Sequence, residues 1–127
     1  YPLQACNQNK KTEAILIKEV MDVHDEAMTK MGILRNLSKK LQLKLDSVEV
    51  GQNTKDKQYT TEIEEAVKKL QDANASMMEW MHQFEQIEEG TPHGEVLRYL
   101  TDQKRLIEEV REDMIGAKKA GDYYINL

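Results

Sequence analysis

The sequence lacks most of the features that mark β-rich, disulfide-bonded or membrane-spanning proteins. Its 127 residues include one cysteine, two prolines, six glycines, one tryptophan and one phenylalanine. A single cysteine excludes an intramolecular disulfide and a zinc site built from several cysteines of one chain. The scarcity of turn-forming and aromatic residues argues against an all-β sandwich. No apolar run approaches the roughly 20 residues that a membrane-spanning helix needs.

What is present is charge of both signs with a small acidic excess. Charged residues make up 32% of the chain and hydrophobic residues 39%, and the net charge of −5 corresponds to a pI of about 5.3. This acidic balance argues against nucleic acid as a partner. A chain of this length and composition is expected to form one helical domain.

The sequence carries no recognisable catalytic arrangement. Its one thiol, Cys6, lies close to the start of the chain, and Ser38, Ser47 and Ser76 have no paired base in their sequence context. A serine or cysteine nucleophile needs an adjacent base or a lowered pKa to react. We therefore expect a protein that is not an enzyme and that uses no cofactor.

Apolar residues recur at intervals of three, four or seven over three long segments, the spacing of one face of an amphipathic helix. We predict helices over residues 12–48, 61–88 and 92–120, with a polar connector at 49–60. Short connections make neighbouring helices antiparallel. The sequence thus predicts an all-α fold, an up-down-up antiparallel three-helix bundle with coiled-coil-like packing and a long first helix.

Several residues are typical of helix ends. Thr61, followed by Glu64, indicates a capping box at the start of the second helix. Thr91 is expected to cap the third helix, with Pro92 as its first residue. Gly121 is a typical residue just beyond a helix C-terminus. The following residues, DYYINL, are expected to form a short apolar tail.

The predicted turn at Gly90 also indicates which residues lie level in the bundle. Counting outward from this turn at equal rise per residue places Asn74 level with Gln103. Two amides in one layer can hydrogen-bond, which removes most of the penalty for burying them. We expect them to form a polar pair that fixes the register of the helices.

The first eleven residues resemble an export signal and a tether rather than part of the bundle. Leu3-Gln4-Ala5-Cys6 is similar to a bacterial lipobox, in which the cysteine becomes the lipidated N-terminus. On this interpretation residues 1–5 are a signal-peptide remnant and residues 7–11 are a flexible tether. Two or more acyl chains suffice for stable anchoring, so we expect Cys6 to attach the protein to a membrane.

The predicted first helix is longer than the second, which leaves part of it without a neighbour. Ile15, Leu16 and Ile17 fall in this overhang. An uncovered apolar stretch favours binding to another protein or to a second copy of the chain. Together with Trp80, these residues form the predicted partner surface, and a homodimer is one possible outcome.

Methionine and histidine residues gather in two segments that the predicted bundle brings level. His24, Met28, Met81 and His82 combine thioether and imidazole groups, which suit soft ions such as Cu(I). One methionine and one histidine can also hold a haem iron. A di-iron site requires two Glu-x-x-His pairs, and only Glu79 with His82 supplies one. Methionines at helical spacing are more often core residues.

Three segments carry a resemblance to a known family: HDEAMTKMGIL, ASMMEWMHQF and YLTDQKRLIEEVREDM. Over about residues 6–120 the chain resembles small helical lipoproteins of Bacteroidetes that are often labelled viral A-type inclusion protein. The resemblance implies a motif on each of the first two helices and a lipidated cysteine. The corresponding residues are His24, Asp25, Glu26 and Met28, then Met78, Trp80, Met81 and Phe84, and Cys6. It implies a fold and a location, and no activity.

These observations support one preferred interpretation and one alternative. We expect a non-enzymatic helical-bundle protein that is lipid-anchored in the bacterial cell envelope, on the periplasmic side or at the cell surface. Its role would be structural, or it would bind an unidentified envelope protein. The alternative is an envelope module that binds Cu(I) through methionine and histidine at one end of the bundle. A cytokine-like signalling bundle would require disulfides and four helices, and the sequence predicts neither.

Overall fold

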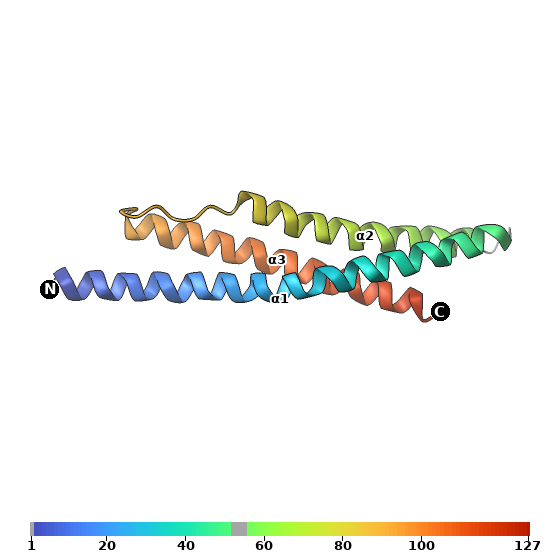
Figure 1. Cartoon of the computed structure of the whole chain (residues 1–127), viewed down its shortest axis with the longest axis horizontal. Coiled ribbons are helices and arrows are strands. Elements are labelled where there is room, and N and C mark those ends of the chain that lie inside the picture. Colours follow the sequence, from blue (N-terminus) through green and yellow to red (C-terminus); the bar gives the residue numbers. More distant parts are fainter. Residues whose placement is uncertain (1, 52–55) are drawn as a thin grey trace.

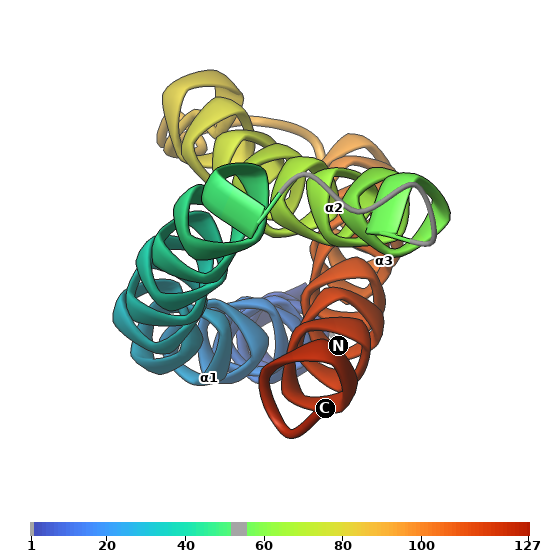
Figure 2. The ribbon, with the colours of Figure 1, turned by 90° about the vertical axis from the view of Figure 1, so that its right-hand side faces the viewer.

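The computed structural model describes residues 2–51 and 56–127, and within them every regular element is a helix. The helices are α1 (Pro2–Gly51), α2 (Asp56–Gln83) and α3 (His93–Ile125). They lie lengthwise beside one another, with α2 antiparallel to the other two (Figure 1). Seen end-on, they surround a common axis, and each helix packs against both others (Figure 2). The predicted all-α, up-down-up three-helix bundle is confirmed.

The core follows from a seven-residue repeat in each helix. A step of seven residues is close to two helical turns, so it keeps one face of the helix turned towards its neighbours. The residues on this repeat have no accessible surface: Val20, Ala27, Leu34 and Leu41 in α1, Ile63, Leu70 and Met77 in α2, and Leu100, Ile107 and Met114 in α3. Each buried large apolar side chain stabilises the fold by about 1.5–3 kcal/mol. This stripe, rather than any single contact, holds the bundle together.

The first helix is longer than the sequence predicted at both ends. Residues 2–11 are helical rather than a flexible tether. Their leucine, glutamine, alanine and lysine residues favour a helix, and a proline is tolerated in its first turn. Further along, α2 begins at Asp56, inside the predicted connector. Residue 1 and residues 52–55, which include the middle of that connector, lie outside the described residues.

The second helix ends at Gln83, five residues before the predicted end. The backbone amide of Phe84 still donates to the carbonyl of Trp80, 2.9 Å away, but the amide of Glu85 donates to the Tyr99 hydroxyl instead. Three acids follow, at residues 85 and 88 within the predicted last turns of the helix and at residue 89 directly after them. Acids near a helix C-terminus oppose the helix dipole and repel one another at this spacing, so they weaken the helix beyond Gln83.

The third helix runs further than predicted, to Ile125. Gly121 is a buried residue within this helix and not a cap. Two other predicted caps are also wrong. Thr61 lies inside α2, where its hydroxyl donates to the carbonyl of Lys57. Pro92, not Thr91, is the N-cap of α3, while the Thr91 hydroxyl donates to the carbonyl of Glu88.

Because α2 ends early, the residues of α2 and α3 that lie side by side differ from those predicted. An extended residue advances the chain by about 3.3 Å and a helical residue by about 1.5 Å. The non-helical residues between α2 and α3 therefore carry the chain further than a helix would. Ala73 borders a groove with Asp113, so Asn74 lies near that part of α3 and not beside Gln103, ten residues earlier. The predicted pair of Asn74 and Gln103 is wrong.

Candidate functional site

A row of aromatic rings closes the bundle where α2 ends. The Trp80 ring stacks on Phe84, with 4.9 Å between centroids. On either side, His24 of α1 lies 5.9 Å from Trp80, and Tyr99 of α3 lies 5.9 Å from Phe84. Trp80 is consequently only 6% exposed. The prediction that Trp80 belongs to a partner surface is wrong, because its neighbours from α1 and from the chain after α2 cover the indole.

The four residues of the predicted Cu(I) site differ in their exposure to solvent. Met28 and His82 are exposed, whereas Met81 packs against the core. The Nδ1 atom of His24 lies 3.0 Å from a carboxylate oxygen of Asp25, and its ring faces Trp80. The contacts found for this imidazole are thus a carboxylate and an indole, whereas Cu(I) favours sulfur and nitrogen ligands.

A site built from carboxylates and histidines is not formed either in the described part of the chain. Within residues 2–51 and 56–127, no group of three or more His, Cys, Asp or Glu side chains comes together as a metal site would require. His93, at the start of α3, is half-buried, and its Nδ1 lies 3.6 Å from the Glu13 carboxylate. This contact joins α3 to α1. It involves two side chains only, which is fewer than a metal site would require.

The predicted lipidation site lies near the beginning of α1. The Cys6 thiol is free and exposed. The side chains of Leu3, Gln4 and Ala5, which complete the predicted motif, are outside the described residues. Within residues 2–51 and 56–127 no helix is both long enough and apolar enough to cross a membrane.

Apolar side chains are exposed along the same part of α1. Ile15 is 61% exposed and Ile17 is 41% exposed, whereas Leu16 is half-buried. Cys6 and Ile17 are eleven residues apart, close to three turns, so they lie on one face of the helix. Ile15 lies on another face. The structure thus brings the thiol and one apolar side chain onto a common face of α1.

The exposure of Ile17 follows from the position at which α2 ends. The Asn74 amide donates to the carbonyl of Met31 at 3.0 Å, which sets the level of α2 against α1. Because the helices are antiparallel, Gln83 lies level with about Asp22. The part of α1 before that level has α3 and a non-helical segment as neighbours, but no turn of α2 (Figure 1).

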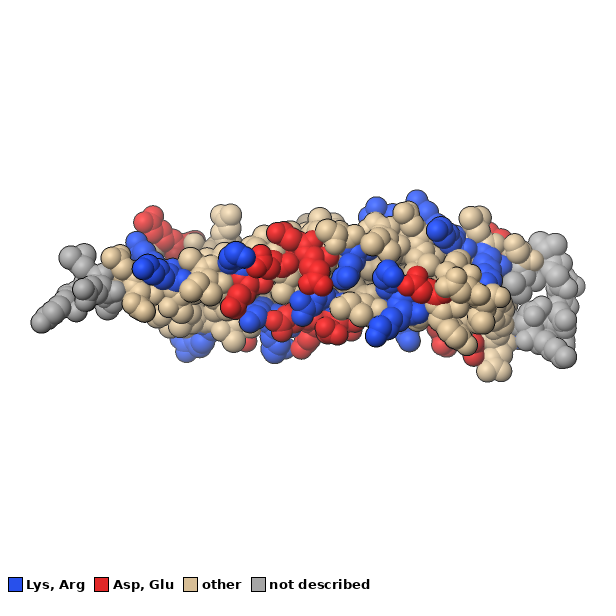
Figure 3. Space-filling view, turned by 90° about the horizontal axis from the view of Figure 1, so that it is seen from below, with Lys and Arg blue, Asp and Glu red and all other residues tan. Residues whose placement is uncertain are grey.

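Two ion pairs join the parallel helices α1 and α3 at matching levels. Lys104 pairs with Glu19 at 3.0 Å, and one heptad further along both helices Arg111 pairs with Glu26 at 3.2 Å. The hydrogen bond to Glu19, followed by the charge of that carboxylate, raises the pKa of Lys104. Acidic side chains form a band across the middle of the face shown in Figure 3. These pairs were not predicted from the sequence, although the matching heptad spacing of acids on α1 and bases on α3 was a usable signal.

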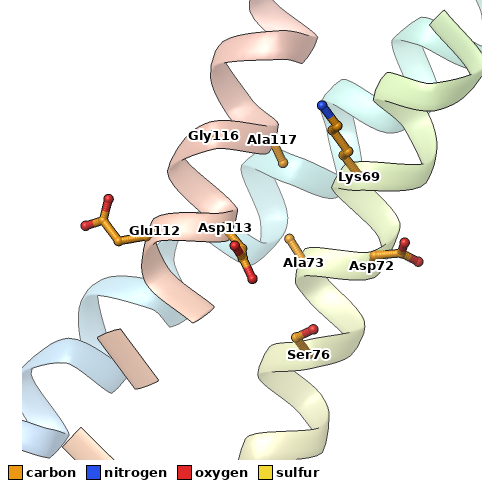
Figure 4. Close-up of a pocket in the computed structure, with 8 residues that line it drawn as sticks. All are labelled: Lys69, Asp72, Ala73, Ser76, Glu112, Asp113, Gly116 and Ala117. Atoms are coloured by element: carbon orange, nitrogen blue, oxygen red, sulfur yellow. The ribbon is translucent and has the colours of Figure 1, made fainter. Parts of the chain in front are cut away.

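Shallow grooves run between the helices. The groove between α2 and α3 has a volume of about 370 Å³, and acids outnumber bases around it (Figure 4). Its charged residues are Lys69, Asp72, Glu112 and Asp113. The α1–α2 groove, of about 440 Å³, is bordered by nine residues and differs in charge: it has two bases and no acid. The nine residues that border the α1–α2 groove are Met31, Arg35, Ser38, Lys39, Gln42, Gln71, Asn74, Ala75 and Met78.

No protein-family model matches the chain, and no curated protein or solved structure shows significant similarity to it. The resemblance to the Bacteroidetes lipoproteins therefore stays a prediction. What the protein does has to be inferred from its own surfaces.

Proposed function

We propose that this chain is a non-enzymatic interaction module of the bacterial cell envelope, held at a membrane through lipid on Cys6. The part of α1 that α2 leaves uncovered presents apolar side chains to an envelope protein. The observation that carries the proposal is the shared face of the exposed Cys6 thiol and the exposed Ile17 side chain. Anchor and contact surface thus belong to one rigid helix.

A lipid on Cys6 would set the height of this surface above the membrane. A helix rises about 1.5 Å per residue, so Ile17 lies roughly three turns from the anchor. An exposed apolar side chain near the anchor is available to a partner that is itself close to the membrane. The two-chain anchor needed for stable attachment matches what a lipobox cysteine carries.

The anchor is tested by expressing the protein from its own gene in bacterial cells supplied with an alkyne-tagged fatty acid. We expect the label on the wild-type protein, which should sediment with membranes. The Cys6→Ser variant should be unlabelled and remain in the supernatant. An unlabelled wild-type protein, or a variant that still sediments with membranes, would contradict the anchor.

The contact surface is tested separately with a photoreactive amino acid introduced in place of Ile17. The matched control carries the same group in place of Lys119, an exposed residue of α3. We expect a discrete crosslinked product from the Ile17 position only, and the identified partner should bind the purified chain. Equal crosslinking from both positions, or none from either, would overturn this part of the proposal.

The alternative of a Cu(I) module has weaker support. It requires His24 to bind the ion together with Met28, Met81 and His82. The structure instead places the His24 ring against Trp80 and its Nδ1 against Asp25. No specific observation favours this function over the interaction module.

A further inference from the structure

The middle of α1 is strongly basic although the protein is acidic. Between Ala27 and Leu45 the sequence contains five lysines or arginines and no acid, whereas the whole chain has a net charge of −5. Arg35 and Lys39 are exposed and form no ion pair with any described residue, while Lys18, Lys68 and Lys118 each pair within their own helix. Two positive charges are therefore available to a negatively charged partner.

These two cations border the α1–α2 groove defined above. The apolar part of the groove is formed by Met31, Ala75 and Met78, and Met78 is 47% exposed. Methionine side chains are flexible and polarisable, so they adapt to apolar side chains of different shapes. The hydrogen bond from Asn74 to the Met31 carbonyl joins the two helices at this point. The groove is thus an apolar strip with positive charge along its α1 side.

We infer that the α1–α2 groove binds an amphipathic helix with acidic flanks, contributed by a partner protein. The inference goes beyond the proposed function: it adds a second binding surface, separate from Ile17, and names the chemical class of the partner that fits it. The partner's apolar side chains pack against Met31 and Met78, as a fourth helix packs in a bundle. Its carboxylates pair with the planar guanidinium of Arg35, which suits bidentate contacts, and with the ammonium of Lys39.

The charge of the α1–α2 groove disfavours binding of a second copy of the chain there. A symmetric dimer through this face would place Arg35 and Lys39 of both copies at one interface. The groove contains no acid to neutralise them. Like charges facing each other across an interface oppose association.

The shape of the α1–α2 groove disfavours a membrane surface as its partner. Met31 is buried between the two helices, so only a protruding side chain reaches it. A flat layer of lipid headgroups would contact Arg35 and Lys39 without filling the apolar strip. A helix fits, because its side chains project as ridges into such a groove.

The test uses the full chain and a synthetic helical peptide with leucine at the core positions of each heptad and glutamate at the flanking positions. A second peptide carries lysine at those flanks. We expect the glutamate peptide to bind and the lysine peptide not to bind. Anionic vesicles of phosphatidylglycerol and phosphatidylcholine provide the membrane comparison.

Two charge-reversed variants locate the binding site. Arg35→Glu combined with Lys39→Glu changes the groove, and Lys40→Glu combined with Lys119→Glu changes exposed cations outside it. Each substitution lowers the net charge by two, so both variants change from −5 to −9 and have the same net charge. We expect the groove variant to weaken peptide binding roughly tenfold or more and the control by less than about twofold, because close charge pairs dominate such coupling. Circular dichroism should show the same helicity for both.

A second pair of variants tests the apolar part of the groove. Met78→Glu should abolish binding of the glutamate peptide, and Ile33→Glu, at a side chain that is equally exposed but outside the groove, should not. Absence of binding to the glutamate peptide, or equal losses in groove and control variants, would overturn the inference. So would vesicle binding that depends on Arg35 and Lys39 without any peptide binding. Because the fatty-acid label on Cys6 and the crosslink at Ile17 do not involve the groove, either proposal can fail alone.

Discussion

The hydroxyl of Tyr99 on α3 accepts a hydrogen bond from the backbone amide of Glu85 at 2.7 Å. This bond lies where α2 stops, and it fastens the chain after α2 to the third helix. The ring of Tyr99 also packs beside Phe84. One side chain thus supplies both a polar and an apolar contact to the segment that returns the chain to α3.

Tyr99→Phe should loosen this segment without unfolding the bundle. The substitution keeps the ring but removes the acceptor for the Glu85 amide, which should destabilise the fold by about 0.5–1 kcal/mol because the site is exposed to water. Hydrogen exchange at the Glu85 amide should become faster. Tyr59→Phe is the matched control, because the Tyr59 hydroxyl makes no hydrogen bond to a described residue. Unchanged exchange at Glu85 in the Tyr99 variant would show that the bond does not hold the segment.

Gly121→Ala should destabilise the protein because α3 approaches its neighbours closely at this position. A Cβ atom at Gly121 would lie 2.5 Å from Cδ2 and 2.9 Å from Cγ of Leu37, and 3.3 Å from Cδ1 of Leu70. Overpacking of this kind costs about 1–3 kcal/mol, which exceeds the gain of about 1 kcal/mol in helix propensity.

The control for this prediction is Gly116→Ala in the same helix. A Cβ atom there has no neighbour within 4 Å among the described residues. We expect this variant to be more stable than wild type by up to about 1 kcal/mol. Chemical denaturation measures both free energies of unfolding. Equal stabilisation by the two substitutions would mean that Leu37 moves aside freely.

Asn74→Leu should stabilise the monomer. The amide donates one hydrogen bond to the Met31 carbonyl, but its own oxygen is buried without a partner in the described structure. Replacing a partly satisfied polar group with an apolar one of similar size should raise the free energy of unfolding by about 1 kcal/mol. Asn74→Ala removes the same groups without filling the space and should be less stable than the leucine variant. If denaturation ranks alanine above leucine, the amide is not the unfavourable element.

Tyr124 should make stability fall at high pH. Burial, followed by the hydrogen bond to Glu62 and the charge of that carboxylate, raises the pKa of its phenol above 10.0. The folded protein therefore retains this proton to a higher pH than the unfolded chain. The contribution to stability is fully present below the unfolded pKa, near 10, and is lost as the pH rises through the folded pKa.

Tyr124→Phe should remove this part of the pH dependence. The control, Tyr123→Phe, alters the neighbouring tyrosine, which is 60% exposed and should leave the dependence in place. All other ionisable groups are common to both variants, so the comparison isolates the Tyr124 phenol. Denaturation curves from about pH 8 to pH 11 measure the effect, since this range brackets the ordinary tyrosine pKa. Parallel curves for the two variants would contradict the prediction.

Local patterns predicted the fold but misplaced the helix ends. The heptad spacing of residues such as Leu34, Leu70 and Ile107 indicated three amphipathic helices, and all three are present. Thr61 and Gly121 matched cap patterns yet lie inside helices. A cap pattern shows that a residue is suited to a helix end, not that the helix ends there. Packing of the neighbouring turns against the other helices can outweigh this local preference.

Sequence alone therefore determined the number of helices, their inward faces and the all-α class, because burial of a repeating apolar stripe dominates the energy of such a fold. The acids after Gln83 weaken the helix there, but only the tertiary structure decided the residue at which α2 ends, since the Tyr99 hydroxyl is brought to the Glu85 amide only when α3 folds back. That end sets the level of α3, covers Trp80 and leaves Ile17 exposed. The acid-free groove at Arg35 and Lys39 likewise depends on which face of α1 meets α2. Periodicity identifies an inward face, but the neighbour that each part of it meets depends on the path of the connecting chain.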